Sequence, residues 1–163
     1  MIKGNAWNYG DNVNTDFILP GKYLELTDPD EMAKHAMEGL DPEFSKNVKQ
    51  GDIIIGGRNF GLGSSREHAP LALKYAGVGA IIAESYARIF YRNSINLGLP
   101  VLECEDISKI IKTGDNVEIN LEKGIMKINK EKTLTFQPVP EFMKKILESG
   151  GLREYIKSYR KDW

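Results

Sequence analysis

Two short apolar runs that flank a helix-like segment constrain the fold of this chain more than any other feature. Residues 51–57 read GDIIIGG and residues 78–85 read VGAIIAES, and both have the length and composition of buried strands. The segment between them, 66–77, has helical spacing, and its Pro70 is tolerated only within the first turn of a helix. A strand–helix–strand unit of this kind predicts an α/β domain.

The C-terminal third of the chain changes its hydrophobic period. Residues 116–136 alternate apolar and polar positions around a Glu-Lys-Gly turn, which predicts an antiparallel β-meander. Residues 140–151 and 152–159 are expected to form closing helices. We therefore expect one domain over residues 1–163, with a mixed sheet, flanking helices and a C-terminal meander.

Two segments near the N-terminus have local signals of their own. Residues 9–23, YGDNVNTDFILPGKY, are rich in turn-forming residues and are expected to form a long exposed loop. Residues 27–40, TDPDEMAKHAMEGL, predict a helix. In that helix Asp28 would cap the N-terminus, Pro29 suits the first position, and Gly39 would end it.

The composition excludes several classes of protein. The chain is 41% hydrophobic, which is enough for a packed core and argues against intrinsic disorder. Its 22 basic and 23 acidic residues nearly cancel, which disfavours a nucleic-acid-binding or membrane-surface role. Without a recognisable signal peptide or membrane span, we expect a cytoplasmic location.

The shortage of metal ligands limits the cofactors that the chain can hold by itself. Cys104 is its one cysteine, so an internal disulfide is impossible, and an iron–sulfur cluster normally needs three or four thiolates. His35 and His68 are the two histidines, which makes a self-contained zinc site improbable. We therefore expect no metal bound by this chain alone.

The turn before the predicted helix of residues 66–77 combines three features that attract anions. Gly61 and Gly63 permit a close backbone approach, and the helix that follows offers free N–H groups at the positive end of its dipole. Ser64 and Ser65 add hydroxyl donors, and Arg66 adds a guanidinium that matches a carboxylate. The turn lacks the spacing of a nucleotide-binding motif.

A purely structural alternative treats one of the two serines as the helix N-cap. Arg66 weakens this alternative, because a cation in the first helical turn opposes the dipole at a cost of roughly 0.3–1 kcal/mol. A ligand anion beside the guanidinium would offset that cost.

Three separated stretches together resemble the swivelling domain of the aconitase superfamily: 59–100, which begins NFGLGSSREHAPL, 10–24, GDNVNTDFILPGKYL, and 139–156, VPEFMKKILESGGLREYI. The chain is similar to the small subunits of the two-chain dehydratases of this superfamily, of the isopropylmalate and homoaconitase types. The resemblance implies a swivelling β/β/α-type domain that dehydrates and rehydrates 2-hydroxy acids. It also implies a large partner subunit that carries a four-iron, four-sulfur cluster.

The resemblance assigns roles to individual residues. Ser64 matches the serine that removes the carbon-bound proton, Ser65 a donor to the substrate carboxylate, and Arg66 the guanidinium that clamps a carboxylate. Asp16 matches an aspartate that orients a catalytic histidine of the large subunit. The alternative for Asp16 is a turn aspartate that bonds its own backbone.

Other polar residues are expected to have structural roles. We expect a structural hydrogen bond for His68 and half-buried packing for His35. Arg88 and Arg92, four apart on a helix, are expected to bind loop backbone or to face the partner subunit. Core positions are expected for Cys104, Met32 and Met37.

The loop that follows Pro20 is where this family sets its substrate. Homoaconitase-type chains often have arginine after the Tyr-Leu pair and isopropylmalate-type chains an apolar residue, whereas this chain has Glu25 and then Leu26. Glu25 would repel a third carboxylate, and Leu26, with the stem of Glu25 if its head turns to water, would contact an isopropyl group, so 3-isopropylmalate is favoured. We expect residues 20–30 to become better ordered when the partner binds.

Two alternatives stay open. One is a related enzyme, the small subunit of homoaconitase or of a methylmalate or dimethylmalate dehydratase. The other is a non-catalytic module that binds a dicarboxylate without a partner.

Overall fold

A seven-stranded sheet forms the centre of residues 1–63 and 66–159, the part of the chain that the computed structural model describes. The strand order is β4-β3-β2-β1-β5-β6-β7, parallel from β4 to β1 and antiparallel from β1 to β7. The strands are β1 Ile2–Gly10, β2 Ile53–Gly56, β3 Ala80–Ala83, β4 Val101–Glu103, β5 Asn116–Asn120, β6 Ile125–Ile128 and β7 Lys132–Thr135.

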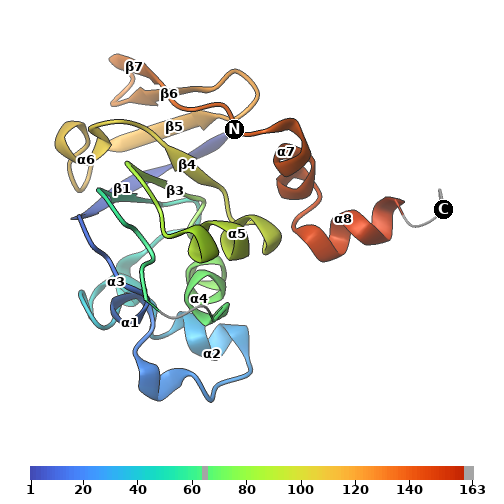
Figure 1. Ribbon diagram of the computed structural model, residues 1–163. Helices are drawn as coiled ribbons and strands as arrows, with labels where there is room; N and C mark the ends of the chain where they lie inside the picture. Colours follow the sequence, from blue (N-terminus) through green and yellow to red (C-terminus); the bar gives the residue numbers. More distant parts are fainter. Residues whose placement is uncertain (64–65, 160–163) are drawn as a thin grey trace.

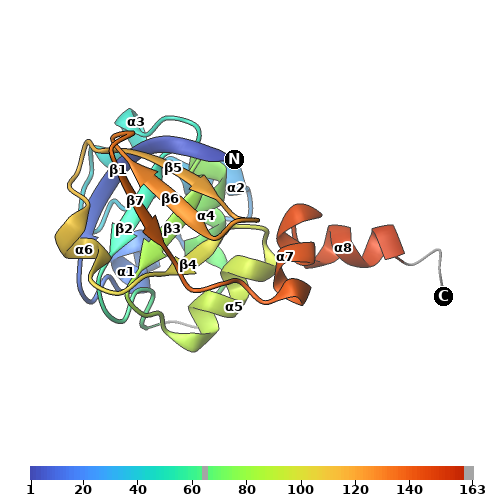
Figure 2. The ribbon, with the colours of Figure 1, turned by 90° about the horizontal axis from the view of Figure 1, so that it is seen from above.

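Helices α1 to α5 cover the parallel part of the sheet on the side opposite the meander, whereas α6 lies on the side of the meander (Figure 1). Only α7 and α8 extend sideways from the body, as the view from above shows (Figure 2). The helices are α1 Thr15–Ile18, η1 Gly21–Tyr23 (a 3₁₀-helix), α2 Pro29–Ala33, α3 Phe44–Asn47, α4 His68–Ala76, α5 Arg88–Asn96, α6 Ile107–Ile110, α7 Glu141–Glu148 and α8 Leu152–Tyr159.

Two hydrophobic clusters lie on opposite faces of the parallel strands. Ile54 and Ile81 belong to the cluster beneath α4 and α5, whereas Ile53 and Ile82 belong to the cluster that the meander and α6 cover. Successive side chains of a strand alternate between faces, so a strand covered on both sides reads as a continuous apolar run. The predicted β/β/α arrangement of a mixed sheet with flanking helices is confirmed.

The central strand–helix–strand unit matches its prediction closely. The two apolar runs form β2 and β3, which pair in parallel. Pro70 lies in the first turn of α4, and Gly77 ends that helix with a φ of 104°. The alternating segment of residues 116–136 forms the antiparallel meander β5–β6–β7.

The prediction of a long exposed loop over residues 9–23 is wrong. The segment contains the end of β1 and all of α1, and it buries Val13, Ile18 and Leu19 at 1%, 0% and 2% exposure. Its order comes from contacts with residues far along the chain, which the local composition does not reveal.

The helix predicted over residues 27–40 is shorter than expected. Asp28 caps it as predicted, because its Oδ1 accepts a hydrogen bond from the amide of Asp30 at 3.0 Å. The regular helix ends at Ala33, and Met37 has a φ of 61°. The cause is tertiary: the Met37 amide donates to the Ile18 carbonyl at 2.7 Å, so the chain leaves the helix to bond α1.

The helices within residues 1–63 and 66–159 are too short and too polar to cross a membrane.

Candidate active site

The loops that follow β1 and β2 lie side by side at the carboxyl ends of these parallel strands. The Gly61 amide donates to the Val13 carbonyl at 2.7 Å, and the Thr15 amide donates to the Leu62 carbonyl at 2.8 Å. In open α/β sheets ligands bind at this edge, outside the carboxyl ends of the strands. The two hydrogen bonds therefore fix the geometry of the place where a ligand is expected.

Gly61 and Gly63 are needed for this close approach. Gly61 has a φ of 85°, and a Cβ atom there would overlap the side chain of Phe90. Gly63 has a φ of 113°, and its Cβ would stand 2.9 Å from Oγ1 of Thr15. Both positions combine a left-handed backbone with lack of space, which only glycine accepts.

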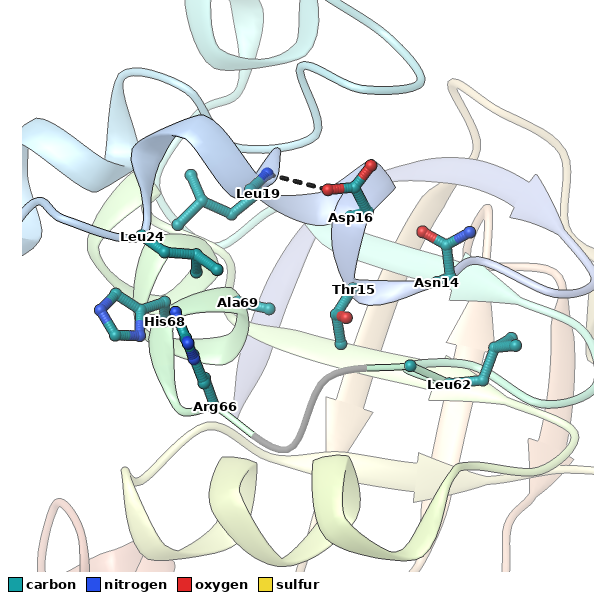
Figure 3. A pocket seen from close by; sticks show the side chains of 11 residues that line it. Asn14, Thr15, Asp16, Leu19, Leu24, Leu62, Arg66, His68 and Ala69 are labelled. Atoms are coloured by element: carbon teal, nitrogen blue, oxygen red, sulfur yellow. Dashed lines mark hydrogen bonds between the residues drawn. The ribbon is translucent and has the colours of Figure 1, made fainter.

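A cavity of about 350 Å³ opens between the two loops and the start of α4 (Figure 3). Its lining divides into a polar part and an apolar part. Asn14, Thr15, Asp16, Arg66 and His68 supply the polar side chains, Leu19, Leu24, Leu62 and Ala69 the apolar ones, and Gly21 and Gly63 the remaining backbone.

The polar part of the cavity favours an anion. Arg66 lies two residues before α4 and lines the cavity, and the first turn of α4 contributes His68 and Ala69. A helix N-terminus carries a partial positive charge and amides without an intrahelical acceptor, so it adds to the attraction of the guanidinium. Carboxylate and phosphate are the groups that this combination fits.

Asp16 is exposed at the cavity, where its Oδ1 accepts a hydrogen bond from the amide of Gly21 at 2.8 Å (Figure 3). The carboxylate thus fastens the start of η1, which is the structural role that the sequence left open for it. A carboxylate has about four lone-pair positions, so this bond leaves capacity for a second donor.

The structural hydrogen bond expected for His68 stays a prediction. Its Nδ1 is buried and has no hydrogen-bond partner in the described part of the chain, and the ring lines the cavity beside Arg66 (Figure 3). The sequence did hold a signal for His68, because it stands at the start of the helix whose N-terminus was singled out.

Ser64 and Ser65, the predicted base and carboxylate donor, lie outside the described residues. The residues on either side of them, Gly63 and Arg66, both line the cavity.

The structure brings Leu24 to the cavity, but not the two residues that the sequence selected. Glu25 is exposed, and Leu26 packs partly buried against the hydrophobic core. Leu24 lines the cavity because η1 ends there and turns its side chain toward Leu19 (Figure 3). Because Glu25 does not line the cavity, the predicted repulsion between Glu25 and a third carboxylate does not apply to a ligand in this cavity.

The remaining polar candidates lie away from the cavity lining. Arg88 and Arg92 are exposed on α5. Cys104 is buried in the core, where burial and then the nearby carboxylates of Asp106 and Glu105 raise the pKa of its thiol. Core positions are confirmed for Met32 and Met37 at 2% and 0% exposure. His35 is half-buried, as expected, and packs against Tyr23.

In residues 1–63 and 66–159, no group of three His, Cys, Asp or Glu side chains gathers closely enough to hold a metal ion.

Fold and site together define a class of protein, the C-terminal domain of aconitase. The model of the aconitase C-terminal domain family matches residues 11–106, which contain both loops of the cavity and α4.

Relatives and a solved structure narrow the class. The small subunit of isopropylmalate/citramalate isomerase from Methanocaldococcus jannaschii is 57% identical over 96% of this chain and 94% of its own length. A 3-isopropylmalate dehydratase small subunit from Halothermothrix orenii is 55% identical over 96% of this chain and 95% of its own.

A crystal structure of 3-isopropylmalate dehydratase from Methanocaldococcus jannaschii superimposes with a TM-score of 0.93. It is 50% identical and covers 98% of this chain and 95% of that one. The chain belongs to the aconitase C-terminal domain family, among the small subunits of 3-isopropylmalate dehydratase.

Proposed function

We propose that this chain is the small subunit of a 3-isopropylmalate dehydratase, a hydro-lyase of leucine biosynthesis that interconverts 2-isopropylmalate and 3-isopropylmalate. One observation carries the proposal: a single cavity joins Arg66 and the N-terminus of α4 to the apolar side chains of Leu19 and Leu24. A malate with a branched alkyl substituent presents the same two kinds of surface, a carboxylate and a hydrocarbon group. The names of the relatives support the assignment.

In this proposal Arg66 binds a substrate carboxylate through two parallel hydrogen bonds, and Ser65 adds a hydroxyl donor. Ser64 takes the carbon-bound proton. A serine hydroxyl is a very weak acid, so its alkoxide needs strong stabilisation. Arg66 and the amides at the start of α4 are the groups of this chain that would supply it, in a site closed to water.

Asp16 has a different proposed task. Its Oδ1 already holds the Gly21 amide at 2.8 Å, which orients the carboxylate rigidly at the cavity. We propose that the same carboxylate accepts a hydrogen bond from a ring N–H of a histidine of the large subunit. This bond would fix the tautomer of that histidine.

The proposed partner is a large subunit that holds a [4Fe–4S] cluster, for which this chain has one cysteine and therefore too few thiolates. Such a cluster would supply an iron that binds and polarises the substrate hydroxyl. The residues of this chain would bind the carboxylate, exclude water from the apolar side and hold the proton.

The apolar wall also separates the candidate substrates. A third carboxylate, as in homocitrate, would meet Leu19 and Leu24 without a partner, and burying an unpaired charge is costly. A methyl group, as in citramalate, would fit the same wall with less contact. Citramalate is therefore the second candidate substrate, and the name of the relative at 57% identity favours it.

The test is reconstitution with the cluster-loaded large subunit of a relative. We expect no turnover of 2-isopropylmalate by the isolated chain, and turnover after mixing. Ser64→Ala in the mixture should lower kcat by at least about a thousandfold, because one general base and its alkoxide are lost. Arg66→Lys should mainly raise KM, since lysine cannot form the bidentate contact.

Arg153→Lys, at an exposed position on α8, is the matched control for Arg66→Lys and should change KM less than twofold. Turnover by the isolated chain, or a fully active Ser64→Ala mixture, would contradict the assignment. Tight binding of a dicarboxylate by the isolated chain, with no activity in any mixture, would favour the non-catalytic module instead.

A further inference from the structure

The carboxylate of Glu38 joins two aromatic residues from separate segments. The hydroxyl of Tyr23, the last residue of η1, donates to Oε1 of Glu38 at 3.0 Å. Nδ1 of His35 lies 2.6 Å from Oε2 of the same carboxylate. The two rings stack on each other with centroids 3.8 Å apart and planes inclined by 11°. Each member of the set of Tyr23, His35 and Glu38 therefore contacts the other two.

Electrostatics favour the ionised form of Glu38. Its partial desolvation acts to raise the pKa of the carboxyl group, but the hydrogen bonds from His35 and Tyr23 outweigh it and lower that pKa. Lys22 acts in the same direction, with its Nζ 5.2 Å from the centre of the Tyr23 ring. The carboxylate is thus available as a double acceptor at neutral pH, and it accepts from His35 when the ring carries a proton on Nδ1, as the charged ring and one of the two neutral tautomers do.

The base of this set is fixed to α1. The Met37 amide donates to the Ile18 carbonyl at 2.7 Å, and the Gly39 amide donates to the Phe17 carbonyl at 3.1 Å. Met37 is fully buried, and a Cβ on Gly39 would stand 2.6 Å from the carbonyl oxygen of Asp16. Glu38 therefore stands between two backbone anchors on the same helix that carries the cavity residue Asp16.

The other end of the set, Tyr23, directly precedes Leu24. The backbone from Gly21 to Leu26 is held locally by three 3₁₀-type bonds. The amides of Tyr23, Leu24 and Leu26 donate to the carbonyls of Pro20, Gly21 and Tyr23 at 2.9, 3.2 and 3.1 Å. Asp16 holds its start, and Glu38 holds it at Tyr23. Leu24 follows directly and lines the cavity.

We propose that Tyr23, His35 and Glu38 form a clamp that fixes η1 and so places Leu24 in the wall of the cavity. The clamp residues touch no ligand in the cavity; they are positioning residues that act through Leu24. The consequence for substrate choice rests on the proposed function, whereas the effect on the loop does not.

The first experiment measures the loop alone, by amide hydrogen exchange in the isolated chain. Glu38→Met removes both acceptor oxygens at similar length, so exchange over residues 21–26 should rise about fivefold, the effect of one or two lost hydrogen bonds. Glu38→Gln keeps an acceptor for Tyr23 and should restore most of the protection.

The matched control is Glu31→Met, the same replacement in an exposed residue whose carboxylate pairs with Lys34 at 2.9 Å and does not contact η1. It should leave exchange in residues 21–26 unchanged. If Glu38→Met and Glu31→Met give the same exchange there, the clamp does not hold the loop and the proposal is wrong.

The second experiment measures substrate choice in the mixture with the large subunit. Glu38→Met should raise KM for 2-isopropylmalate about fivefold with kcat within twofold, and should affect the smaller citramalate less, because Leu24 contacts a methyl group less than an isopropyl group. Faster exchange with an unaltered ratio of the two kcat/KM values would overturn the link to the cavity wall. If wild-type mixtures turn over neither substrate, the proposed function fails, and the exchange comparison still decides the clamp.

Discussion

At the scale of single residues, the shape of the cavity depends on glycines, because a side chain at these positions would not fit. Gly61 lies against the ring of Phe90, and its amide donates a hydrogen bond to the Val13 carbonyl. The loop after β2 therefore has no room for a side chain at this position. Its neighbours Leu62 and Gly63 line the cavity. Any change at Gly61 would therefore act on both stability and site geometry.

We expect Gly61→Ala to lower the free energy of unfolding by about 3 kcal/mol, combining the strain of a positive φ with overlap against Phe90. Urea denaturation measures this. The matched control is Gly114→Ala, where φ is 96° and no atom lies within 4 Å of the added Cβ. It should cost about 1 kcal/mol, the backbone term alone. Equal losses at the two positions would show that the contact with Phe90 is not tight.

The same scale explains which site residues the sequence could predict. Arg66 and Asp16 were selected because residue type and the neighbouring motif indicate their chemistry, and the structure places both in the cavity lining. Leu24 was missed in favour of Glu25 and Leu26, because the facing of side chains on a short 3₁₀-helix depends on how that helix is fastened. The fastening residue, Glu38, lies fifteen positions from Tyr23 in the sequence.

At the scale of elements, the sequence pattern correctly predicted the elements whose signals lie in contiguous residues. The runs that form β2 and β3 and the signals of α4 are properties of contiguous residues. The prediction of a loop over residues 9–23 failed because that segment is ordered by tertiary hydrogen bonds. Its Val13 carbonyl accepts from the Gly61 amide, and its Thr15 amide donates to the Leu62 carbonyl. Turn-rich composition cannot be distinguished from such a tertiary arrangement without knowing the partner segment.

Lys74 is the equivalent fastening point for the C-terminal helices. Its Nζ donates to the carbonyl of Leu97, the C-cap of α5, and at 3.3 Å to the carbonyl of Gly150. Gly150 lies between α7 and α8. A Cβ on Gly98 would overlap the Gly150 carbonyl, so the two segments touch closely. One lysine on α4 thus satisfies carbonyls at the ends of two other helices.

We expect Lys74→Met to raise amide exchange around Gly150 and Gly151 about fivefold, because methionine keeps the apolar stem but leaves two carbonyls without this donor. Hydrogen exchange read by mass spectrometry tests the effect. Lys109→Met is the control, since Lys109 forms only an exposed i,i+3 pair with Asp106 at 3.7 Å. A rise of equal size in the control would remove the assigned role of Lys74.

At the scale of the whole molecule, the site lies on the rim rather than inside. The cavity opens at the carboxyl ends of β1 and β2, away from α7 and α8, and several of its lining residues are exposed, among them Asp16, Leu62 and Arg66 (Figures 1 and 3). An exposed guanidinium attracts a carboxylate weakly, because water screens the charge. A second surface that covers the rim would exclude that water and strengthen the same contact.

This geometry predicts how ligand affinity depends on assembly. Calorimetry with 2-isopropylmalate should give a dissociation constant of roughly 1 mM or weaker for the isolated chain, since one cation and a helix N-terminus act in water. With the large subunit added, the Ser64→Ala chain, chosen to prevent turnover, should bind at least tenfold tighter. Arg66→Lys should remove most of that gain and Arg153→Lys none, because Arg66 lines the cavity whereas Arg153 is exposed on α8. Micromolar binding by the isolated chain would mean that the rim already forms a complete site, and covering by a partner would then be unnecessary for recognition.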